Sequence, residues 1–299
     1  MRPRAVEARV LAQAKINLFL RVLAREVSGY HSIETLFFRL ELGDMVRVRV
    51  GNGVERSIHC HGPVCPTDGL GPPERNLAYR AATAYADATG WPRSFAIDIE
   101  KHIPVGGGLG GGSADAGAVL RLFDTMAPRP AGPGTIAKIA ARLGADVPFL
   151  ASESACALAW GRGERLLGMR PPPRRHVELL IPPFAVSTQW AYEQLAATWR
   201  ERTPRPALHT LEGLSSWEYL TDVAANDLEP VVAARYGEIS ACVVALRSRG
   251  ARIAMMSGSG STVFGIFDRW ADQVSEVPAE VRSVRTRTAT RVVEVVPIE

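Results

Sequence analysis

The stretch Pro104-Val105-Gly106-Gly107-Gly108-Leu109-Gly110-Gly111-Gly112-Ser113 decides how this 299-residue sequence folds. It lies between a predicted strand at 95–99 and a predicted helix, which Ser113 caps and whose apolar residues follow the 3.6-residue period. Backbone N–H groups at such a junction, together with the helix dipole, surround an anion, and glycines let the backbone approach it closely. A flexible linker rarely lies between a strand and a capped helix. We therefore predict a phosphate-binding loop.

Two common phosphate loops do not match this stretch. A Walker A loop requires Lys and then Ser or Thr after its last glycine, whereas Ser113 directly follows Gly112. A Rossmann pattern can be placed on Gly106, Gly108 and Gly111, but a glycine run this dense produces that spacing by itself. No strand clearly follows the helix, as a dinucleotide-binding unit requires. The loop is therefore expected to hold phosphate through its backbone, without a lysine of its own.

The first half of the sequence predicts a mostly antiparallel sheet accompanied by helices. A Pro- and Gly-rich stretch at 62–73 is expected to be a surface loop, and Asn76 or a neighbour starts an alanine-rich helix. Thr135 is expected to cap a helix that ends at Gly144. The expected strands lie at 9–22, 33–38, 45–50, 95–99 and 155–160, and the expected helices at 76–89, from 113 to the break at 128, and at 135–144.

The arginine- and proline-rich stretch at 170–175 is the best candidate for a domain boundary. It divides the chain into an N-terminal domain at 1–172 and a C-terminal domain at 173–299. The stretch 201–220 has little periodicity and is expected to be a mobile insertion. The expected strands of the second, smaller α+β unit lie at 177–181, 252–256, 262–267 and 291–296, and its helices near 189–200, 228–235 and 238–249.

Lysine is rare in this sequence, which holds only Lys15, Lys101 and Lys138 among 35 basic residues. A lysine offers a compact charge with three rotatable donors, which suits contact with a phosphate or a substrate hydroxyl. Lys15 and Asn17 form a polar pair inside an otherwise apolar strand. The rarity therefore favours a specific role for Lys15 or Lys101, although an arginine-biased genome with three solvated lysines is the alternative.

Phosphoryl transfer also needs a group that positions or deprotonates the attacking hydroxyl. Asp146, in Gly144-Ala145-Asp146-Val147-Pro148, follows a predicted helix end, where the chain turns and a carboxylate can point into a cleft. Taken alone, Asp146 could equally be a turn residue and Lys15 a solvated one. The two side chains are candidates for the chemistry that the glycine loop lacks.

A second glycine cluster, Ser257-Gly258-Ser259-Gly260-Ser261, lies between two predicted strands. By itself this cluster indicates a tight strand connection, and it could equally contact bound phosphate. Its combination with the first loop favours a nucleotide-binding cleft between two domains.

The cysteines and histidines indicate neither a disulfide framework nor a metal site. The four cysteines show no CxxC pair, which fits a reducing cytoplasm. The segment His59-Cys60-His61 with Cys65 nearby resembles metal-ligand spacing, but successive strand residues face opposite ways. No fourth ligand has an obvious place. We therefore predict no bound structural metal.

Charge and hydropathy argue against two further classes of protein. The net charge is +4, and the arginines are scattered instead of grouped with aromatic neighbours, which argues against a nucleic-acid-binding protein. No apolar stretch approaches the roughly 18 residues that a membrane span needs. The sequence therefore predicts a cytoplasmic protein that is neither exported nor embedded in a membrane.

Four segments in this order resemble the three-motif pattern of the GHMP kinase superfamily, along nearly the whole chain. They are the strand with Ala14-Lys15-Ile16-Asn17, then PVGGGLGGGSADA, GADVPF and SGSGSTVF. The element Gly29-Tyr30-His31, after AKINLFL, is similar to one branch of that superfamily. Members of this branch phosphorylate the 2-hydroxyl of 4-diphosphocytidyl-2-C-methyl-D-erythritol in the non-mevalonate isoprenoid route.

The resemblance implies an N-terminal ribosomal-S5-like α/β domain and a ferredoxin-like C-terminal domain. It also implies ATP as phosphate donor, accompanied by Mg²⁺. The aspartate that matches Asp146 is the catalytic base in the family, and the lysine that matches Lys15 lies beside it and assists the nucleophilic hydroxyl. The implied nucleotide-binding positions are Asn76, Lys101, Pro104, Val105, Gly106, Gly107, Gly108, Leu109, Gly110, Gly111, Gly112, Ser113 and Ala114.

The resemblance likewise implies a set of substrate residues. His31 matches a residue that reads the cytosine edge, and Tyr30 and Tyr192 match aromatics that sandwich the ring. Asn17 and Thr188 approach the polar remainder of the substrate. We therefore expect a cytidyl diphosphate small molecule as partner, at most a weak homodimer, and no nucleic acid or membrane partner.

Three alternatives stay open at this point. Another GHMP kinase, acting on homoserine, mevalonate or a sugar, keeps the glycine loop but has no cytosine for Tyr30 and His31 to contact. A nucleotide-binding regulator without catalysis is favoured if Asp146 lies away from the loop. An RNA-binding protein that uses the S5-like sheet is the third, although the unclustered arginines argue against it.

Overall fold

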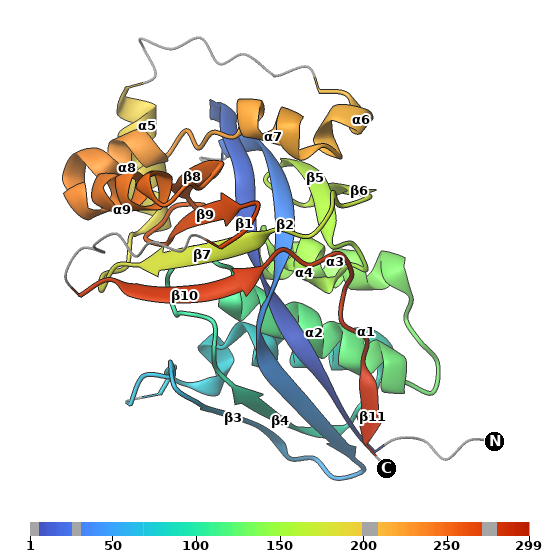
Figure 1. Ribbon diagram of the computed structural model, residues 1–299. Helices are drawn as coiled ribbons and strands as arrows, with labels where there is room; N and C mark the ends of the chain where they lie inside the picture. The colour runs from blue at the N-terminus through green and yellow to red at the C-terminus, as the bar shows by residue number, and fades with distance from the viewer. Residues whose placement is uncertain (1–5, 26–30, 68, 199–208, 271–279, 299) are drawn as a thin grey trace.

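The computed structural model describes residues 6–25, 31–67, 69–198, 209–270 and 280–298, which fold into two sheets with helices (Figure 1). The strands are β1 (Glu7–Arg25), β2 (His31–Gly51), β3 (Arg56–His61), β4 (Ser94–Glu100), β5 (Cys156–Gly161), β6 (Arg165–Met169), β7 (His176–Ile181), β8 (Ile253–Met256), β9 (Val263–Phe267), β10 (Arg282–Arg287) and β11 (Val296–Ile298). The α-helices are α1 (Leu77–Thr89), α2 (Gly111–Met126), α3 (Pro133–Leu143), α4 (Val147–Ala151), α5 (Thr188–Ala197), α6 (Leu211–Leu214), α7 (Trp217–Val223), α8 (Glu229–Arg235) and α9 (Gly237–Ser248), and a 3₁₀ turn spans Pro73–Arg75. The α+β class is as predicted.

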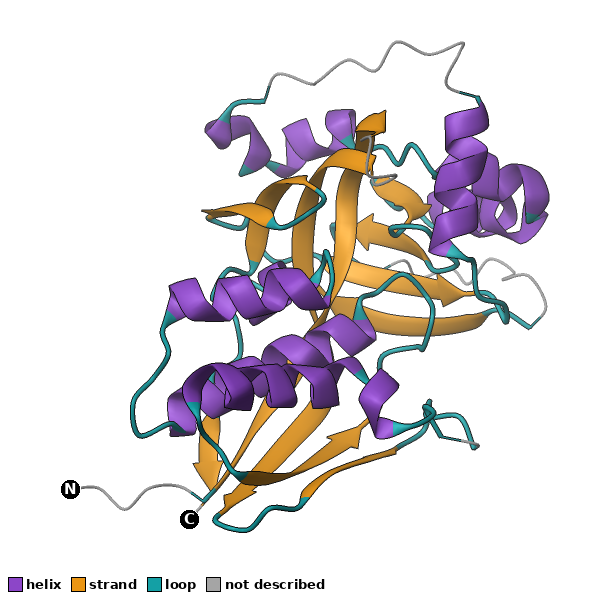
Figure 2. Ribbon diagram, turned by 180° about the vertical axis from the view of Figure 1, so that it is seen from behind, coloured by secondary structure: helices purple, strands orange, loops and turns teal. Residues whose placement is uncertain are grey.

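The larger sheet carries the glycine loop. Among the described residues it has seven strands in the order β11-β1-β2-β4-β3, and β5 pairs with both β2 and β6. Helices α1 to α4 lie together on one side of this sheet (Figure 2). The strand β4 leads directly into the loop, and α2 follows it, so the loop joins the edge of the sheet to the helix layer.

The smaller sheet is antiparallel, with the order β10-β7-β9-β8 among the described residues, and its strands β7, β9 and β8 are buried on both faces, whereas the edge strand β10 is largely exposed. Val177, Leu179 and Phe264 belong to the same apolar cluster as the larger sheet. Leu180 and Phe267 point the other way and pack with α5, α8 and α9. The smaller sheet therefore joins the two halves through a shared core instead of a hinge exposed to solvent.

The local helix signals were only partly correct. Asn76 caps α1 through a hydrogen bond from the Ala78 N–H, and Gly90 ends that helix, as predicted. Ser113 and Thr135, however, do not cap helices. The N-caps of α2 and α3 are Gly110 and Gly132, because each glycine takes a positive φ that turns the chain into the helix earlier than the hydroxyl residue does.

Two predicted strand boundaries also change. The segments 33–38 and 45–50 are parts of one strand, β2, which pairs with β1 along most of its length and also with β4 and β5. The predicted strand at 291–296 is displaced to β11, which pairs with β1 in the larger sheet and does not complete the smaller unit. The domain boundary near residue 172 stays a proposal, and the last strand crosses back over it.

The stretch expected to be a mobile insertion is partly ordered. Residues 201–208 lie outside the described residues, but α6 and α7 follow, and Trp217 is buried against Phe38 with ring centroids 5.5 Å apart. The Trp217 indole N–H donates to the Pro173 carbonyl at 2.6 Å. Leu214, Trp217 and Leu220, which are three residues apart, are buried and hold this segment against the rest of the protein.

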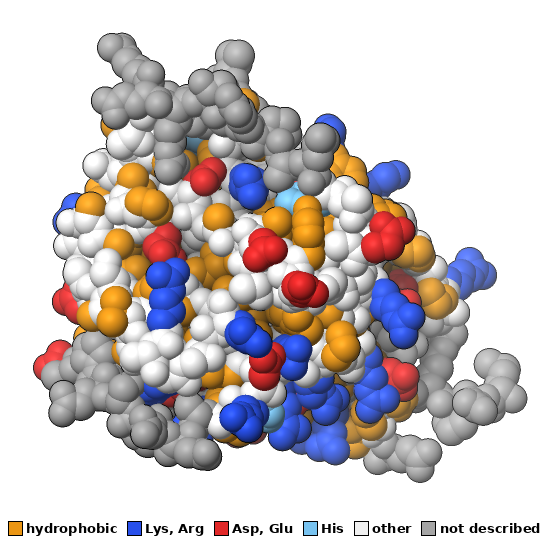
Figure 3. Space-filling model, turned by 45° about the horizontal axis from the view of Figure 1, so that its top comes forward, with side chains coloured by type: hydrophobic (Ala, Val, Ile, Leu, Met, Phe, Trp, Pro, Cys, Tyr) orange, Lys and Arg blue, Asp and Glu red, His pale blue; other side chains and the backbone are white. Residues whose placement is uncertain are grey.

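The surface carries charges of both signs. On the face shown in Figure 3, basic side chains gather toward the lower edge, with acidic side chains among and above them. Several surface arginines pair with carboxylates, including Arg174 with Glu41 and both Arg175 and Arg252 with Asp268. Among the described residues, every helix is too short or too polar to span a lipid bilayer.

Candidate active site

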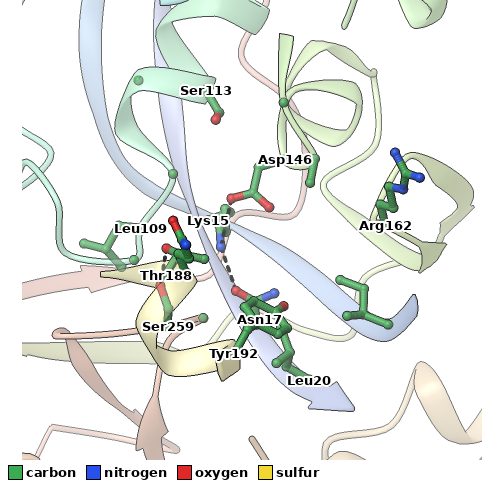
Figure 4. Close-up of a pocket in the computed structure, with 18 of the residues that line it drawn as sticks. Lys15, Asn17, Leu20, Leu109, Ser113, Asp146, Arg162, Thr188, Tyr192 and Ser259 are labelled. Atoms are coloured by element: carbon green, nitrogen blue, oxygen red, sulfur yellow. Dashed lines mark hydrogen bonds and ion pairs between the residues drawn. The ribbon is translucent and has the colours of Figure 1, made fainter. Parts of the chain in front are cut away.

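A cavity of about 1710 Å³ lies between the two glycine loops and contains most of the predicted site residues. Figure 4 shows side chains from β1, α2 and α5, and that of Asp146 just before α4, around this cavity. Its lining includes Lys15, Asn17, His31, Pro104, 106–113, Asp146, Thr188, Tyr192 and 258–260.

Lys15 and Asp146 meet inside this cavity. The Lys15 Nζ lies 3.2 Å from Asp146 Oδ2 and donates to Asn17 Oδ1 at 2.7 Å. The Lys15 side chain is only 4% exposed, whereas that of Asp146 is 30% exposed. Register shifts between β1 and β2 on either side of Lys15 and Asn17 interrupt the regular ladder. The buried ammonium of Lys15 thus holds the Asp146 carboxylate at a position where it remains accessible from the cavity.

Asp146 reaches the cavity because of its position between two helices. It follows the end of α3 and is the N-cap residue of α4, but its side chain makes no capping hydrogen bond. Its backbone carbonyl accepts instead from the Leu150 N–H at 3.1 Å. The backbone holds the turn, so the carboxylate is left to face Lys15 and the cavity, just past a helix end as the sequence predicted.

The first glycine loop presents a row of donors. The first helical bond of α2 runs from the Ala114 N–H to the Gly110 carbonyl, so the N–H groups of Gly111, Gly112 and Ser113 precede any intrahelical partner. The Ser113 hydroxyl, which was expected to cap the helix, lines the cavity instead. Donors at a helix N-terminus suit the oxygens of a phosphate.

The second glycine loop holds the first one in place. The Ser257 hydroxyl donates to the Gly108 carbonyl at 3.1 Å, and the Thr262 N–H donates to Gly107 at 3.2 Å. A Cβ on Gly108 would lie 2.4 Å from the Ser257 carbonyl oxygen, and Gly108 has a φ of +77°, so no other residue fits there. The predicted pairing of the two loops is therefore present, and it is a backbone contact.

The substrate-side residues gather where α5 meets β1 and β2. The His31 and Tyr192 rings are stacked, with centroids 4.8 Å apart. The Thr188 and Ser259 hydroxyls lie 2.8 Å apart. Burial raises the pKa of Tyr192, and the negative charges of Asp146 and Asp227 add to this effect. Tyr30 lies outside the described residues.

Four predicted nucleotide-binding residues do not line the cavity: Asn76, Lys101, Val105 and Ala114. The Asn76 side chain caps α1, and Lys101 lies beneath the loop. The Lys101 ammonium is 3% exposed and pairs with Asp44 and, at 2.6 Å, with Asp115. Burial disfavours its charge, but the two carboxylates outweigh burial and raise the pKa of Lys101. This position supports the loop and does not support direct nucleotide contact.

The sequence did not single out several residues that shape the site. The cavity lining also includes Arg142, Arg162, Glu164 and Arg165; Arg162 and Glu164 belong to the turn between β5 and β6, and Arg165 is the first residue of β6. The signal for that turn was Gly161-Arg162-Gly163-Glu164, a short glycine pattern between two strands.

Asn226 was also missed. Its amide donates to the carbonyls of Met256 and, at 2.7 Å, Gly258, while its Oδ1 accepts from the Leu228 N–H. It therefore fixes the start of the second glycine loop. Asn226 lies 32 residues from Gly258 in a segment with no motif, so no local pattern could identify it.

Comparison with known proteins gives consistent results for both halves of the chain. Residues 76–154 match the family described as GHMP kinases N terminal domain, and residues 207–282 match GHMP kinases C terminal. A 4-diphosphocytidyl-2-C-methyl-D-erythritol kinase from Citrifermentans bemidjiense is 38% identical over 259 residues, which cover 87% of this chain and 89% of the relative. A kinase of the same name from Nitratidesulfovibrio vulgaris (strain DP4) is 37% identical over 268 residues, covering 86% and 89%.

Solved structures agree with these relatives. A crystal structure of 4-(cytidine 5'-diphospho)-2C-methyl-D-erythritol kinase superposes with a TM-score of 0.74 at 33% identity, covering 94% of this chain and 98% of that one. A homoserine kinase from Cytophaga hutchinsonii has a TM-score of 0.70 at 16% identity, covering 99% of each chain, and so shares the fold alone. The chain is therefore a kinase and belongs to the 4-diphosphocytidyl-2-C-methyl-D-erythritol kinase family within the GHMP kinases.

Proposed function

We propose that this kinase transfers the γ-phosphate of ATP to the 2-hydroxyl of 4-diphosphocytidyl-2-C-methyl-D-erythritol in the non-mevalonate isoprenoid route. One observation carries the proposal: the Lys15–Asp146 pair lies in the same cavity as the glycine loop and the His31–Tyr192 stack. Figure 4 gives the order, with Ser113 on one side of the pair and Asn17 and Tyr192 on the other. A phosphate donor and a hydroxyl acceptor could therefore approach the pair from opposite sides.

The Asp146 carboxylate would accept the proton of the substrate hydroxyl as its oxygen attacks the γ-phosphorus, and ADP would leave with the electrons of the broken P–O bond. The Lys15 ammonium, 3.2 Å from that carboxylate, would orient it and attract the negatively charged reactants. The N–H groups of Gly111, Gly112 and Ser113 would hold phosphate oxygens. Lys15, Asp146 and the backbone of 111–113 all line the cavity, so none of these roles requires a rearrangement of the protein.

Mg²⁺ fits this site because hydroxyl and carboxylate oxygens are the ligands it prefers. The Ser113 hydroxyl and the Asp146 carboxylate point toward the same space in Figure 4. These two side chains are the ones we expect to hold it. When bound with the nucleotide, Mg²⁺ neutralises charge on the phosphates.

Recognition of the cytidyl group would rest on His31, with Tyr30 and Tyr192 on the faces of the base. The rings of His31 and Tyr192 already contact each other. A cytosine must therefore extend this stack or separate the two rings, and either arrangement uses aromatic stacking. Asn17 and Thr188 would contact the polar remainder of the substrate. We further propose that the enzyme works in the cytoplasm, at most as a weak homodimer, without nucleic acid or membrane partners.

The test is a coupled ADP-release assay with ATP, Mg²⁺ and four alcohols: the cytidyl methylerythritol, homoserine, mevalonate and galactose. We expect ADP release with the first alone. Turnover of another alcohol would replace the substrate assignment by one of the other GHMP activities. ATP binding without turnover of any of the four would favour a nucleotide-binding regulator.

Replacement of His31 tests nucleobase recognition separately. We expect His31→Ala to raise KM for the cytidyl substrate by at least tenfold with little change in ATP affinity, because His31 lies in the cavity beside Tyr192. His176→Ala is the matched control, since His176 contacts Trp270 outside the cavity. Equal loss of affinity for ATP and substrate in His31→Ala would contradict the assignment.

A further inference from the structure

The larger sheet has a polar cluster on the face that α1 to α4 leave uncovered. In β3 the side chains of Ser57, His59 and His61 are exposed, whereas those of Ile58 and Cys60 are half-buried. Strand alternation therefore puts both imidazoles on one face and Cys60 on the other. Cys60 contacts Asn76, and burial raises the pKa of its thiol to about 11, so it is no partner for the histidines.

A third ligand comes from the neighbouring strand. β3 pairs in parallel with β4 so that His59 lies opposite Asp98. The His59 Nδ1 is 3.1 Å from Asp98 Oδ2, and the His61 Nε2 is 3.1 Å from Asp98 Oδ1. The three ligand atoms all lie within 4.8 Å of one another. The sequence could not supply this residue, because Asp98 is 37 positions from His61 and only the strand register joins them.

The geometry fits a borderline transition-metal ion. With metal–ligand bonds near 2.0–2.2 Å, neighbouring ligand atoms of a tetrahedral site lie about 3.3 Å apart. Each imidazole nitrogen lies 3.1 Å from a different oxygen of Asp98, and one ligand atom from each of the three residues lies within 4.8 Å of the others. Both imidazoles are exposed, so rotation of the rings can bring the three ligand atoms to the spacing of a tetrahedral site. Two imidazoles and one carboxylate are a donor set that Zn²⁺, Ni²⁺ and Co²⁺ accept, with room left for water.

The surrounding charges permit a cation. The Asp98 side chain is 48% exposed and faces both imidazoles across the strand pair. Arg47 lies opposite Asp98 on β2, and its guanidinium pairs with Glu7. Glu100, two residues after Asp98 on β4, pairs with His102, which follows the end of that strand. Asp98 is thus an available anionic ligand.

We propose that His59, His61 and Asp98 form a binding site for one divalent transition-metal ion of the Zn²⁺ or Ni²⁺ type, outside the catalytic cavity. Such an ion links the edge strand β3 to β4. The His61 carbonyl accepts from the Lys101 N–H at 2.7 Å, so the same link reaches the residue that supports the glycine loop. The site does not depend on the substrate of the kinase.

The experiment is calorimetric titration of untagged, metal-free, full-length protein with NiCl₂ and, separately, ZnCl₂, without nucleotide. We expect one equivalent of bound ion and a rise in Tm with ion concentration. The variant His59→Gln/His61→Gln should bind at least tenfold more weakly, and Asp98→Asn should also weaken binding. His102→Gln is the matched control, because His102 has a carboxylate partner on the same sheet but lies outside the proposed site.

Several outcomes would overturn the proposal. If the unmodified protein binds no stoichiometric ion, the three side chains form only hydrogen bonds with one another and no metal site. Unchanged binding in His59→Gln/His61→Gln, with an unchanged metal-free Tm, places the ion elsewhere. Titration with Co²⁺ adds a spectroscopic readout, since thiolate charge-transfer absorption would assign the ion to a cysteine and also refute the site.

Discussion

Two buried lysines, Lys15 and Lys101, have the same kind of partner and different surroundings. Each is less than 4% exposed as a residue and pairs with aspartate. The partner of Lys15, Asp146, has a side chain that is 30% exposed, whereas the partners of Lys101, Asp44 and Asp115, are 0% and 3% exposed. Access of one carboxylate to the cavity, and not the ion pair itself, distinguishes the site for chemistry from the support beneath it.

The largest effect should come from the exposed carboxylate. Asp146→Asn keeps the shape of the side chain but removes the proton acceptor, so we expect kcat to fall by about 10²–10⁴-fold. Tm, and the affinity for ATP measured without Mg²⁺, should change little, because the backbone of Asp146 and not its carboxylate holds the turn. Steady-state ADP release, ATP titration and thermal unfolding measure the three quantities. Asp222→Asn, at an exposed position of α7, is the control.

The enclosed lysine should affect stability instead. Lys101→Met leaves two carboxylates buried without their cation, which we expect to reduce the free energy of unfolding by about 3–5 kcal/mol. Lys15→Met should reduce the free energy of unfolding less than Lys101→Met does, since the Asp146 carboxylate can turn to solvent. It should reduce kcat more, because Lys15 lies in the catalytic cavity. Lys138→Met, at an exposed position of α3, supplies the baseline. Chemical denaturation of the three variants ranks them, and equal destabilisation by Lys15→Met and Lys101→Met would remove the distinction.

The two partners of Lys101 should also differ from each other. Asp44 accepts from Lys101 and from the backbone N–H groups of His102 and Ile103, at 2.5 and 2.7 Å. Asp115 accepts from Lys101 alone, and its Oδ1 has no hydrogen-bond partner among the described residues. We therefore expect Asp44→Asn to destabilise the protein more than Asp115→Asn, by a margin that urea titration can resolve.

A pH dependence follows for Asp115. Burial raises the pKa of its carboxyl to about 7, with Lys101 opposing this shift and Asp44 adding to it. The folded state thus keeps a proton that the unfolded chain loses near its ordinary pKa of 3.8, so this group lowers stability as pH rises from about 4 to about 7. Relative to Asp115→Asn, the unmodified protein should lose stability between pH 5 and pH 7. A constant difference over that range would contradict the raised pKa.

The same contrast explains what the sequence could predict. The glycine loop, the Asn76 cap, the helix ends at Gly90 and Gly144, and the place of Asp146 depend on residues close together in the chain. The partners of Lys101 depend on the register that brings Asp44 of β2 against the end of β4, 57 residues away. Long-range pairing has no local signature, so no pattern near Lys101 reveals that it pairs with two buried carboxylates beneath the loop, and its contact with the nucleotide stays a prediction.

The error at the C-terminal end has a similar cause. The segment 291–295 is apolar enough to predict a strand, but its backbone groups bond to side chains. The Gln13 amide donates to the Arg291 carbonyl and accepts from the Val293 N–H, and Arg121 donates to the Val293 carbonyl. One glutamine on β1 thus replaces a strand ladder until β11 begins, and no pattern within 291–296 reveals that partner.

The smallest effect should come from Thr35, which neither lines the cavity nor contacts Lys15 directly. Its hydroxyl accepts from the Asn17 amide at 2.9 Å and donates to the Phe19 carbonyl at 2.6 Å, while Asn17 Oδ1 accepts from Lys15. Thr35 therefore fixes which way the Asn17 amide faces. Thr35→Val removes that constraint at nearly constant volume, and a loss of about 1 kcal/mol in positioning corresponds to a kcat about fivefold lower.

Rescue separates positioning from packing. Thr35→Ser keeps the hydroxyl and loses a methyl group, so it should recover most of the kcat that Thr35→Val loses, even if its Tm is lower. A structural role alone would give the opposite order, since valine fills the buried site better than serine. Thr221→Val, whose hydroxyl donates to the Trp217 carbonyl within α7, should leave kcat unchanged. If kcat in Thr35→Ser falls with Tm below that of Thr35→Val, then the orientation of Lys15 toward Asp146 does not pass through Asn17, and the two lysines differ only in the exposure of their partners.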